Sequence, residues 1–227
     1  MMTALLRAFA ALPTPPLRRA VLLSLAIAVA TFALLSLGAA ACLDSAQFFG
    51  WAPLNWLIDI LGGLAVLALS WLLFPAVVTL VMGFFLDGVA AAVEARDYPG
   101  QRPARRAPIR EILATTMRLM GLTILLNLMA LPLYILVPGI NLFLFLALNG
   151  YLFGREYFEV VALRRLDTTA ARAMRRRFGG YVFVGGVVIA GLFALPLVNL
   201  VAPVIAVAFM VHVFQALAAR EPRLLAR

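Results

Sequence analysis

The chain has 227 residues, of which 65% are hydrophobic and 13% charged, and its mean hydropathy is +1.04. Because about a quarter of the residues in soluble proteins are charged, this composition excludes a soluble globular protein and indicates an integral membrane protein. The formal net charge is +9, but the arginines flank apolar segments, which favours anionic lipid headgroups over nucleic acid as their surroundings.

All nineteen basic residues are arginines, and they fall into four clusters. The clusters are separated by residues 20–95, 119–154 and 178–219, which contain no basic residue. Basic residues collect on the cytoplasmic side of membrane proteins, so we expect every cluster, and both termini, to lie in the cytoplasm. The sequence therefore predicts a multi-pass membrane protein that returns to the cytoplasm after each excursion.

Residues 1–19 are predicted to be a cytoplasmic segment, and residues 20–93 to form two long transmembrane helices. The connection between these helices, residues 44–56, contains aromatic residues and no arginine, as expected of an extracytoplasmic turn at the membrane surface. The second helix is longer than the ~20 residues that cross the hydrocarbon. It is therefore either strongly tilted, broken at Pro75 or extended into the cytoplasm.

The second half of the chain contains two similar apolar hairpins, residues 111–166 and 178–219. A cytoplasmic loop, residues 94–110, precedes the first hairpin, a basic cytoplasmic turn, residues 167–177, separates the two, and residues 220–227 form a cytoplasmic tail.

Each hairpin turns at a Pro-x-x-Asn-Leu sequence. We expect Pro138 and Pro196 to end the incoming helices, and Asn141 and Asn199 to cap the outgoing ones. The hairpin arms are short and interrupted by proline and glycine, which favours partial penetration of the membrane over full spanning. The predicted fold is thus an all-α integral membrane protein with two long transmembrane helices and two partly penetrating helical hairpins, assembled as a homo-oligomer.

Enzyme signatures are largely absent. The chain has no lysine, so it cannot contain a P-loop and is not a nucleotide-driven pump. His212 is the only histidine and Cys42 the only cysteine, so we expect no metal site, no cofactor and no intrachain disulfide.

Two groups of polar residues are candidates for function, the first as a binding site for an oxyanion and the second as an ion pathway. Arg18 and Arg19 follow two prolines at the start of the first long helix, where free N–H groups attract anions; the alternative is that they only contact headgroups.

The second group, Arg155, Glu156 and Glu159, follows an apolar helix. It is either an ion pathway at membrane depth or a helix end that emerges into water. Arg155 and Glu159 are four residues apart and can pair on one helix face. Weaker carboxylate candidates on the second helix are Asp59, Asp87 and Glu94.

Three short motifs in this order make the chain, from about residue 13 to 217, resemble the CysZ family of sulfate permeases, which is grouped with etoposide-induced-protein-like membrane proteins. The sequence Pro-Pro-Leu-Arg-Arg at residues 15–19 is similar to the family's Pro-Gly-hydrophobic-Arg-Arg motif. Val-Pro-Gly-Ile at residues 137–140 resembles its Ile-Pro-Gly-Ile turn, and residues 195–200 resemble its last hairpin turn.

The resemblance implies an oligomeric permease of the bacterial inner membrane that takes up sulfate for cysteine biosynthesis. It implies that Arg18 and Arg19 contact the sulfate and that Leu17 contributes a backbone N–H. Pro16 stands where the family has glycine, and proline has no N–H to donate. For the coupling of transport to protons or cations we expect Asp87, Glu156 and Glu159.

A second interpretation is a non-transporting membrane scaffold that organises lipids or partner proteins through its arginine-rich turns. A permease should bring the Arg18 region and the carboxylates together toward a wet cavity on a continuous path, whereas a scaffold would leave them scattered at the headgroups. A membrane enzyme is the third interpretation, and the lack of any recognisable nucleophile with a base disfavours it.

Overall fold

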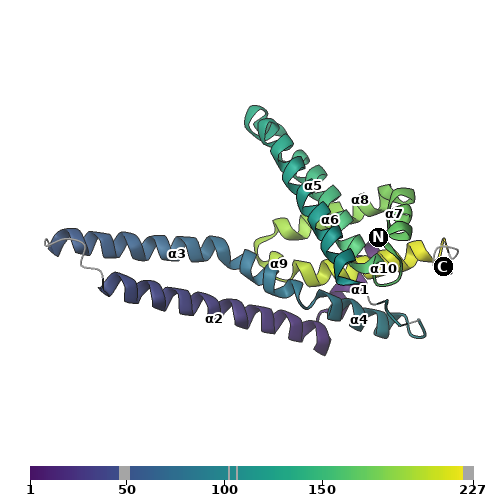
Figure 1. Cartoon of the computed structure of the whole chain (residues 1–227), viewed down its shortest axis with the longest axis horizontal. Helices are drawn as coiled ribbons and strands as arrows, with labels where there is room; N and C mark the ends of the chain where they lie inside the picture. Colours follow the sequence, from purple (N-terminus) through teal and green to yellow (C-terminus); the bar gives the residue numbers. More distant parts are fainter. Residues whose placement is uncertain (46–51, 102, 106, 222–227) are drawn as a thin grey trace. The chain divides into compact units, whose positions relative to one another are not determined.

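The computed structural model describes residues 1–45, 52–101, 103–105 and 107–221, and every regular element in these ranges is helical (Figure 1). This confirms the predicted all-α fold. The elements are α1 (Met2–Ala11), α2 (Pro15–Ser45), α3 (Ala52–Gly83), α4 (Leu86–Asp97), α5 (Ile109–Leu136), the 3-10 turn η1 (Pro138–Ile140), α6 (Asn141–Ala162), α7 (Thr168–Arg177), α8 (Gly179–Ala194), α9 (Pro196–Asn199) and α10 (Ala202–Ala218).

The chain divides into two compact units. The α2–α3 unit consists of Arg18–Phe85, and the α10 unit consists of Met1–Leu17 together with Leu86–Arg227.

The α2–α3 unit contains the two long helices that the sequence predicts. Pro15–Ala41 of α2 and Ile60–Gly83 of α3 are both long and apolar enough to cross a membrane. The two helices lie side by side, and the ring centroids of Phe32 and Phe74 are 5.7 Å apart (Figure 1). The predicted extracytoplasmic turn falls partly on residues 46–51, outside the described ranges.

The second long helix is not broken at Pro75, which lies inside α3. The helix ends at Gly83, and a separate helix, α4, begins at Leu86. The extension toward the cytoplasm that the sequence allowed is therefore a helix of its own, and it belongs to the other unit.

α10 forms the core of the α10 unit. It packs against α1, α4, α6 and α8, and its residues from Ala202 to Phe214 are all buried. Because an apolar helix that is covered on all sides needs no polar face, the sequence of α10 is hydrophobic all round except for His212 and Gln215. α10 thus holds the surrounding helices in place.

α6 and α8 pack closely against each other because glycines line their contact. A Cβ atom added to Gly186 would lie 1.8 Å from the carbonyl oxygen of Gly150, and one added to Gly154 would lie 2.4 Å from the carbonyl oxygen of Val182. No side chain fits at either position. This contact fixes the half of α6 that carries the charged residues of the site.

Both predicted hairpins are present, and each incoming helix ends just before the proline of its turn. α5 ends at Leu136 and α8 at Ala194. The predicted asparagine caps are wrong: the N-cap residues of α6 and α10 are Ile140 and Val201, and neither makes a side-chain cap hydrogen bond. Asn141 lies inside the first turn of α6, and Asn199 in the short α9.

The two hairpins differ in the length of their incoming helices. α5 has 28 residues and also satisfies the length and composition of a membrane span, although Pro132 lies inside it. α7 and α8 are bent by 89° at residue 178, and together they form either a broken span or a re-entrant segment. Partial penetration by the hairpins therefore stays a prediction.

Candidate functional site

A cavity of about 760 Å³ lies in the α10 unit between α4, the segment before α5, α5 itself and the end of α6. Much of its wall is apolar or hydroxylated, with Thr115 and Thr116 on α5. Its charged lining residues come from three different segments and include three carboxylates and two guanidinium groups. They are Asp87, Arg105, Glu156, Glu159 and Arg164.

Glu156 and Glu159 reach the same cavity because residues three apart in a helix lie on one face. Glu159 is 6% exposed and is held by Arg155, with Nε 3.2 Å from its Oε1, and by Arg175 at 3.5 Å. The predicted pairing of Arg155 with Glu159 is therefore present. Glu156 differs, because among the described residues it has neither a hydrogen bond nor an ion pair.

Arg155 lines a second, smaller pocket of about 50 Å³ together with Tyr151 and Arg175. Since Glu159 lines the large cavity and bonds Arg155, it lies between the two spaces. Its Oε2 atom is buried and has no hydrogen-bond partner. The pair therefore keeps one carboxylate oxygen available to a proton, a water or a cation.

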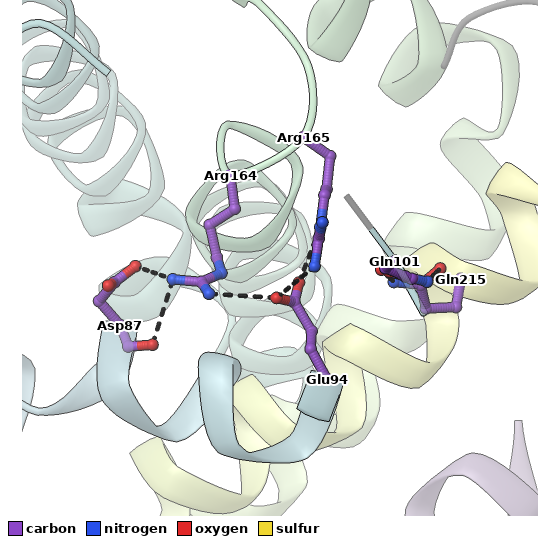
Figure 2. Close-up of polar contacts among 6 residues, drawn as sticks. All are labelled: Asp87, Glu94, Gln101, Arg164, Arg165 and Gln215. Atoms are coloured by element: carbon purple, nitrogen blue, oxygen red, sulfur yellow. Dashed lines mark hydrogen bonds and ion pairs between the residues drawn. The ribbon is translucent and has the colours of Figure 1, made fainter. Parts of the chain in front are cut away.

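Arg164, which follows α6, pairs with two carboxylates of α4, one in its first turn and one near its end. Figure 2 shows its guanidinium group between the carboxylates of Asp87 and Glu94, with Nη2 3.1 Å from Oε2 of Glu94. Nη1 contacts the Asp87 carboxylate and lies 3.2 Å from the Asp87 carbonyl oxygen. Arg165 reaches the same Glu94 carboxylate, with Nη2 2.7 Å from Oε2.

The Arg164 guanidinium is charged although its side chain is only 8% exposed. Burial by itself would lower its pKa, but the hydrogen bonds to Glu94 and Asp87 outweigh burial and raise the pKa above its usual value. Arg164 is held between the buried Glu94 carboxylate and the carboxylate of Asp87, whose side chain is 82% exposed, and Arg164 and Asp87 form a polar wall of the cavity.

Arg105 connects the segment before α5 to this wall. Its N–H donates to the carbonyl oxygen of Arg164 at 2.8 Å, and its side chain pairs with Glu111 at the start of α5. Thr168, in the first turn of α7, donates a hydrogen bond to the same Glu111 carboxylate. The ends of α5, α6 and α7 are therefore joined by one polar network at the cavity.

The arginine motif predicted to bind an anion lies in the first turns of α2. Arg18 and Arg19 are exposed, and Leu17 is buried at 1% exposure. Thr14 donates both its N–H and its hydroxyl to Ala11 O, and the next two residues are prolines. The N–H of Leu17 is therefore the one backbone donor that residues 14–17 can offer.

The structure brings Asp87, Glu156 and Glu159 to one cavity, and it places Arg155 against Glu159. Arg18 and Arg19 belong to the α2–α3 unit. No group of three His, Cys, Asp or Glu that could hold a metal ion occurs among the residues the structure describes.

Sequence reasoning missed Arg105, Arg164 and Arg165 as site residues. Glu94 was named only as a weak candidate, and its partners lie 70 and 71 positions further along the chain. Such a separation leaves no local pattern in the sequence. The one usable signal is the pair of neighbouring arginines, Arg164 and Arg165, directly after the apolar α6. Such a pair is equally expected where a helix simply ends on the cytoplasmic side of a membrane.

A family model described as sulfate transporter CysZ/etoposide-induced protein 2.4 matches residues 4–203 of this chain. A comparison with curated proteins found no match.

Proposed function

This chain belongs to the sulfate transporter CysZ/etoposide-induced protein 2.4 family, and from that membership we propose that it is an inner-membrane permease that takes up sulfate for cysteine biosynthesis. The protein works without ATP, as a homo-oligomer in contact with membrane lipids, and both of its termini lie in the cytoplasm. The observation that carries the proposal is the cavity of about 760 Å³, on which charged groups from α4, α6 and the segment before α5 converge. A scaffold has no need of such convergence.

The anion contacts are assigned to the start of α2. Arg18 and Arg19 present forked donors that match a tetrahedral oxyanion, and both side chains are exposed and free to turn toward it. Leu17 adds one backbone N–H. With Pro15 and Pro16 ahead of it, this site relies on its guanidinium groups more than on backbone donors.

The carboxylates of the cavity are assigned to coupling. Moving a divalent anion inward against an inside-negative potential costs ~2.3 kcal/mol per charge per 100 mV, so uptake requires a coupling ion or a strong concentration gradient. Glu156 is the best candidate to carry a proton, because no described arginine neutralises it. Glu159 and Asp87 are held in ion pairs, and they shape the path.

The experiment that tests this function is sulfate uptake into proteoliposomes that contain the purified protein. We expect uptake above that of empty vesicles, and a loss of at least about tenfold in Arg18→Ala/Arg19→Ala. Arg176→Ala is the matched control, since Arg176 is an exposed arginine of α7 with no described partner. Uptake by the folded wild-type protein that does not exceed empty vesicles, with and without a proton gradient, would reject the permease.

One observation supports the scaffold as a second candidate. The last turn of α7 carries Arg175, Arg176 and Arg177, and the latter two are exposed. Each arginine near a membrane surface contributes ~1 kcal/mol to the binding free energy for anionic lipid. Folded protein that transports no sulfate but clusters anionic lipid through α7 would favour this function.

A further inference from the structure

A further pocket of the α10 unit is separate from both the carboxylate-lined cavity and the small pocket at Arg155. It has a volume of about 380 Å³ and is formed by α1, by the C-terminal half of α10 and by two tyrosines, Tyr98 and Tyr181. α1 packs directly against α10, and the two helices lie beside each other in Figure 1. Arg7 on α1 and Arg220 just after α10 both line the pocket.

The pocket is positively charged. Its lining contains two arginines and no Asp or Glu. Within the described part of the chain, neither Arg7 nor Arg220 has a carboxylate within the 4.0 Å of an ion pair, and the guanidinium of Arg220 lies 5.1 Å from the ring centroid of Tyr181. Two cations that share one pocket without a counter-charge repel each other, and a bound anion would remove that repulsion.

Two acidic residues lie close to the lining residues, and each is paired with an arginine outside the lining. Asp97 is 3.0 Å from Arg96 and 3.6 Å from Nε2 of His212, and Glu221 is 2.6 Å from Arg177. Neither Asp97 nor Glu221 lines the pocket. An anion that bound between Arg7 and Arg220 would therefore come from outside the described chain.

Neutral hydrogen-bonding groups complete the site. The hydroxyl of Tyr98 lies 2.8 Å from Nδ1 of His212, and both residues line the pocket. Burial raises the pKa of Tyr98, and the nearby Arg7 only partly opposes this, so the phenol carries its proton at neutral pH. Thr3 adds a second hydroxyl.

We propose that this pocket binds a phosphate group, with the guanidinium groups of Arg7 and Arg220 as its principal ligands. Arginine forks match the geometry of phosphate oxygens, and two of them can bind one phosphate from two sides. The volume lies in the range of organic ligand sites, and Val213, Ala216 and Leu217 supply an apolar wall. A phosphate group that carries an apolar portion, such as a phospholipid headgroup, fits this lining.

The test is a binding titration of the purified, delipidated full-length protein in detergent. The probes are dihexanoyl phosphatidic acid, inorganic phosphate and dihexanoyl glycerol, which lacks the phosphate. We expect phosphatidic acid to bind, dihexanoyl glycerol not to bind, and Arg7→Gln and Arg220→Gln each to weaken binding by about tenfold. Arg110→Gln, at an exposed arginine of α5 with no described partner, is the matched control and should bind like the wild type. Binding is measured directly, so a failure of sulfate transport does not affect the result.

The two phosphate-bearing probes separate the sources of the ligand. Inorganic phosphate that binds as tightly as phosphatidic acid would identify a free phosphate site, and weaker binding would identify a lipid site; both results support the proposal. Both arginines are exposed, so their replacement should leave the helix content unchanged. If a glutamine variant loses helix, Arg7→Lys and Arg220→Lys are titrated instead, and weakened binding is again expected. Wild-type protein that binds neither probe, or folded variants that bind like the wild type, would overturn the proposal.

Discussion

Glu94 and Arg164 lie 70 positions apart in the chain and form a buried ion pair in which Nη2 is 3.1 Å from Oε2. Their side chains are 5% and 8% exposed, and Arg165 and Asp87 complete the group on either side. This contact connects α4 to the turn between α6 and α7 and holds Arg164 in the wall of the large cavity. The contact is therefore both structural and part of the candidate site.

Replacing Glu94 by Gln should destabilise the protein strongly. The substitution removes the carboxylate shared by Arg164 and Arg165 and leaves buried positive charge behind, which typically costs about 3 kcal/mol. Thermal unfolding in detergent, followed by circular dichroism, should show a clear fall in Tm. The control is Arg177→Ala, which breaks the pair between the exposed Arg177 and the half-buried Glu221 and should change stability by less than about 1 kcal/mol. Equal Tm values for the two variants would contradict the assignment.

Replacing Gly186 by Ala should prevent α6 and α8 from packing. The new Cβ would lie 1.8 Å from the carbonyl oxygen of Gly150, and a backbone atom in a helix cannot give way. We expect aggregated or unfolded protein in gel filtration.

The control for this contact lies in the same helix. Gly191→Ala places a Cβ where no other atom lies within 4 Å, so it should leave the protein folded or raise its stability by up to ~1 kcal/mol through helix propensity. A well-folded Gly186→Ala variant would show that the two helices do not approach this closely.

Glu156→Gln and Glu159→Gln should have different effects although both residues line one cavity. Glu156 has no described partner, so its substitution should leave Tm nearly unchanged and reduce the effect of a proton gradient on sulfate uptake. Glu159→Gln leaves Arg155 and Arg175 without their carboxylate and should lower Tm. Proteoliposome uptake at two external pH values, together with Tm, separates these effects. An unaltered gradient dependence in Glu156→Gln would exclude that residue as the coupling group.

Tyr98 should make the protein sensitive to alkaline pH. Burial raises its pKa above the usual value of 10.0, so above about pH 10 the unfolded chain releases the phenol proton while the folded protein still holds it. The stability contributed by this group is complete below pH 10 and is lost as the pH rises toward the folded-state pKa.

The measurement is Tm between pH 9 and 11 for the wild type and Tyr98→Phe. The variant should be somewhat less stable at neutral pH, because it lacks the hydrogen bond to His212, and its Tm should fall less steeply above pH 10. Parallel curves for the two proteins would contradict the raised pKa.

Much of the fold could be predicted from local patterns. The long stretches without arginine predict the long apolar helices, and Pro138 and Pro196 mark where α5 and α8 end, because proline removes a helix hydrogen bond. The asparagine caps were predicted wrongly. Both turns continue into short helical segments, so Asn141 and Asn199 already lie inside helices.

The end of α3 and the helix α1 were also not predicted. The apolar run continues without interruption across Gly83, so hydropathy alone cannot separate α3 from α4. The N-terminal segment was assigned only to the cytoplasm, and its helix is stabilised by packing against α10, a contact between opposite ends of the chain.

The sequence by itself determined that this is a membrane protein of apolar helices and arginine-rich turns, and it identified the Arg155–Glu159 pair, because composition, proline positions and i,i+4 spacing are local properties. Only the tertiary structure decided that Glu94 would hold Arg164 and that Asp87 would share a cavity with Glu156. These partners come from helices about 70 residues apart, and their pairing depends on the close glycine contact of α6 with α8 and on the burial of α10. Contacts of this kind follow from packing in three dimensions, which no short stretch of sequence specifies.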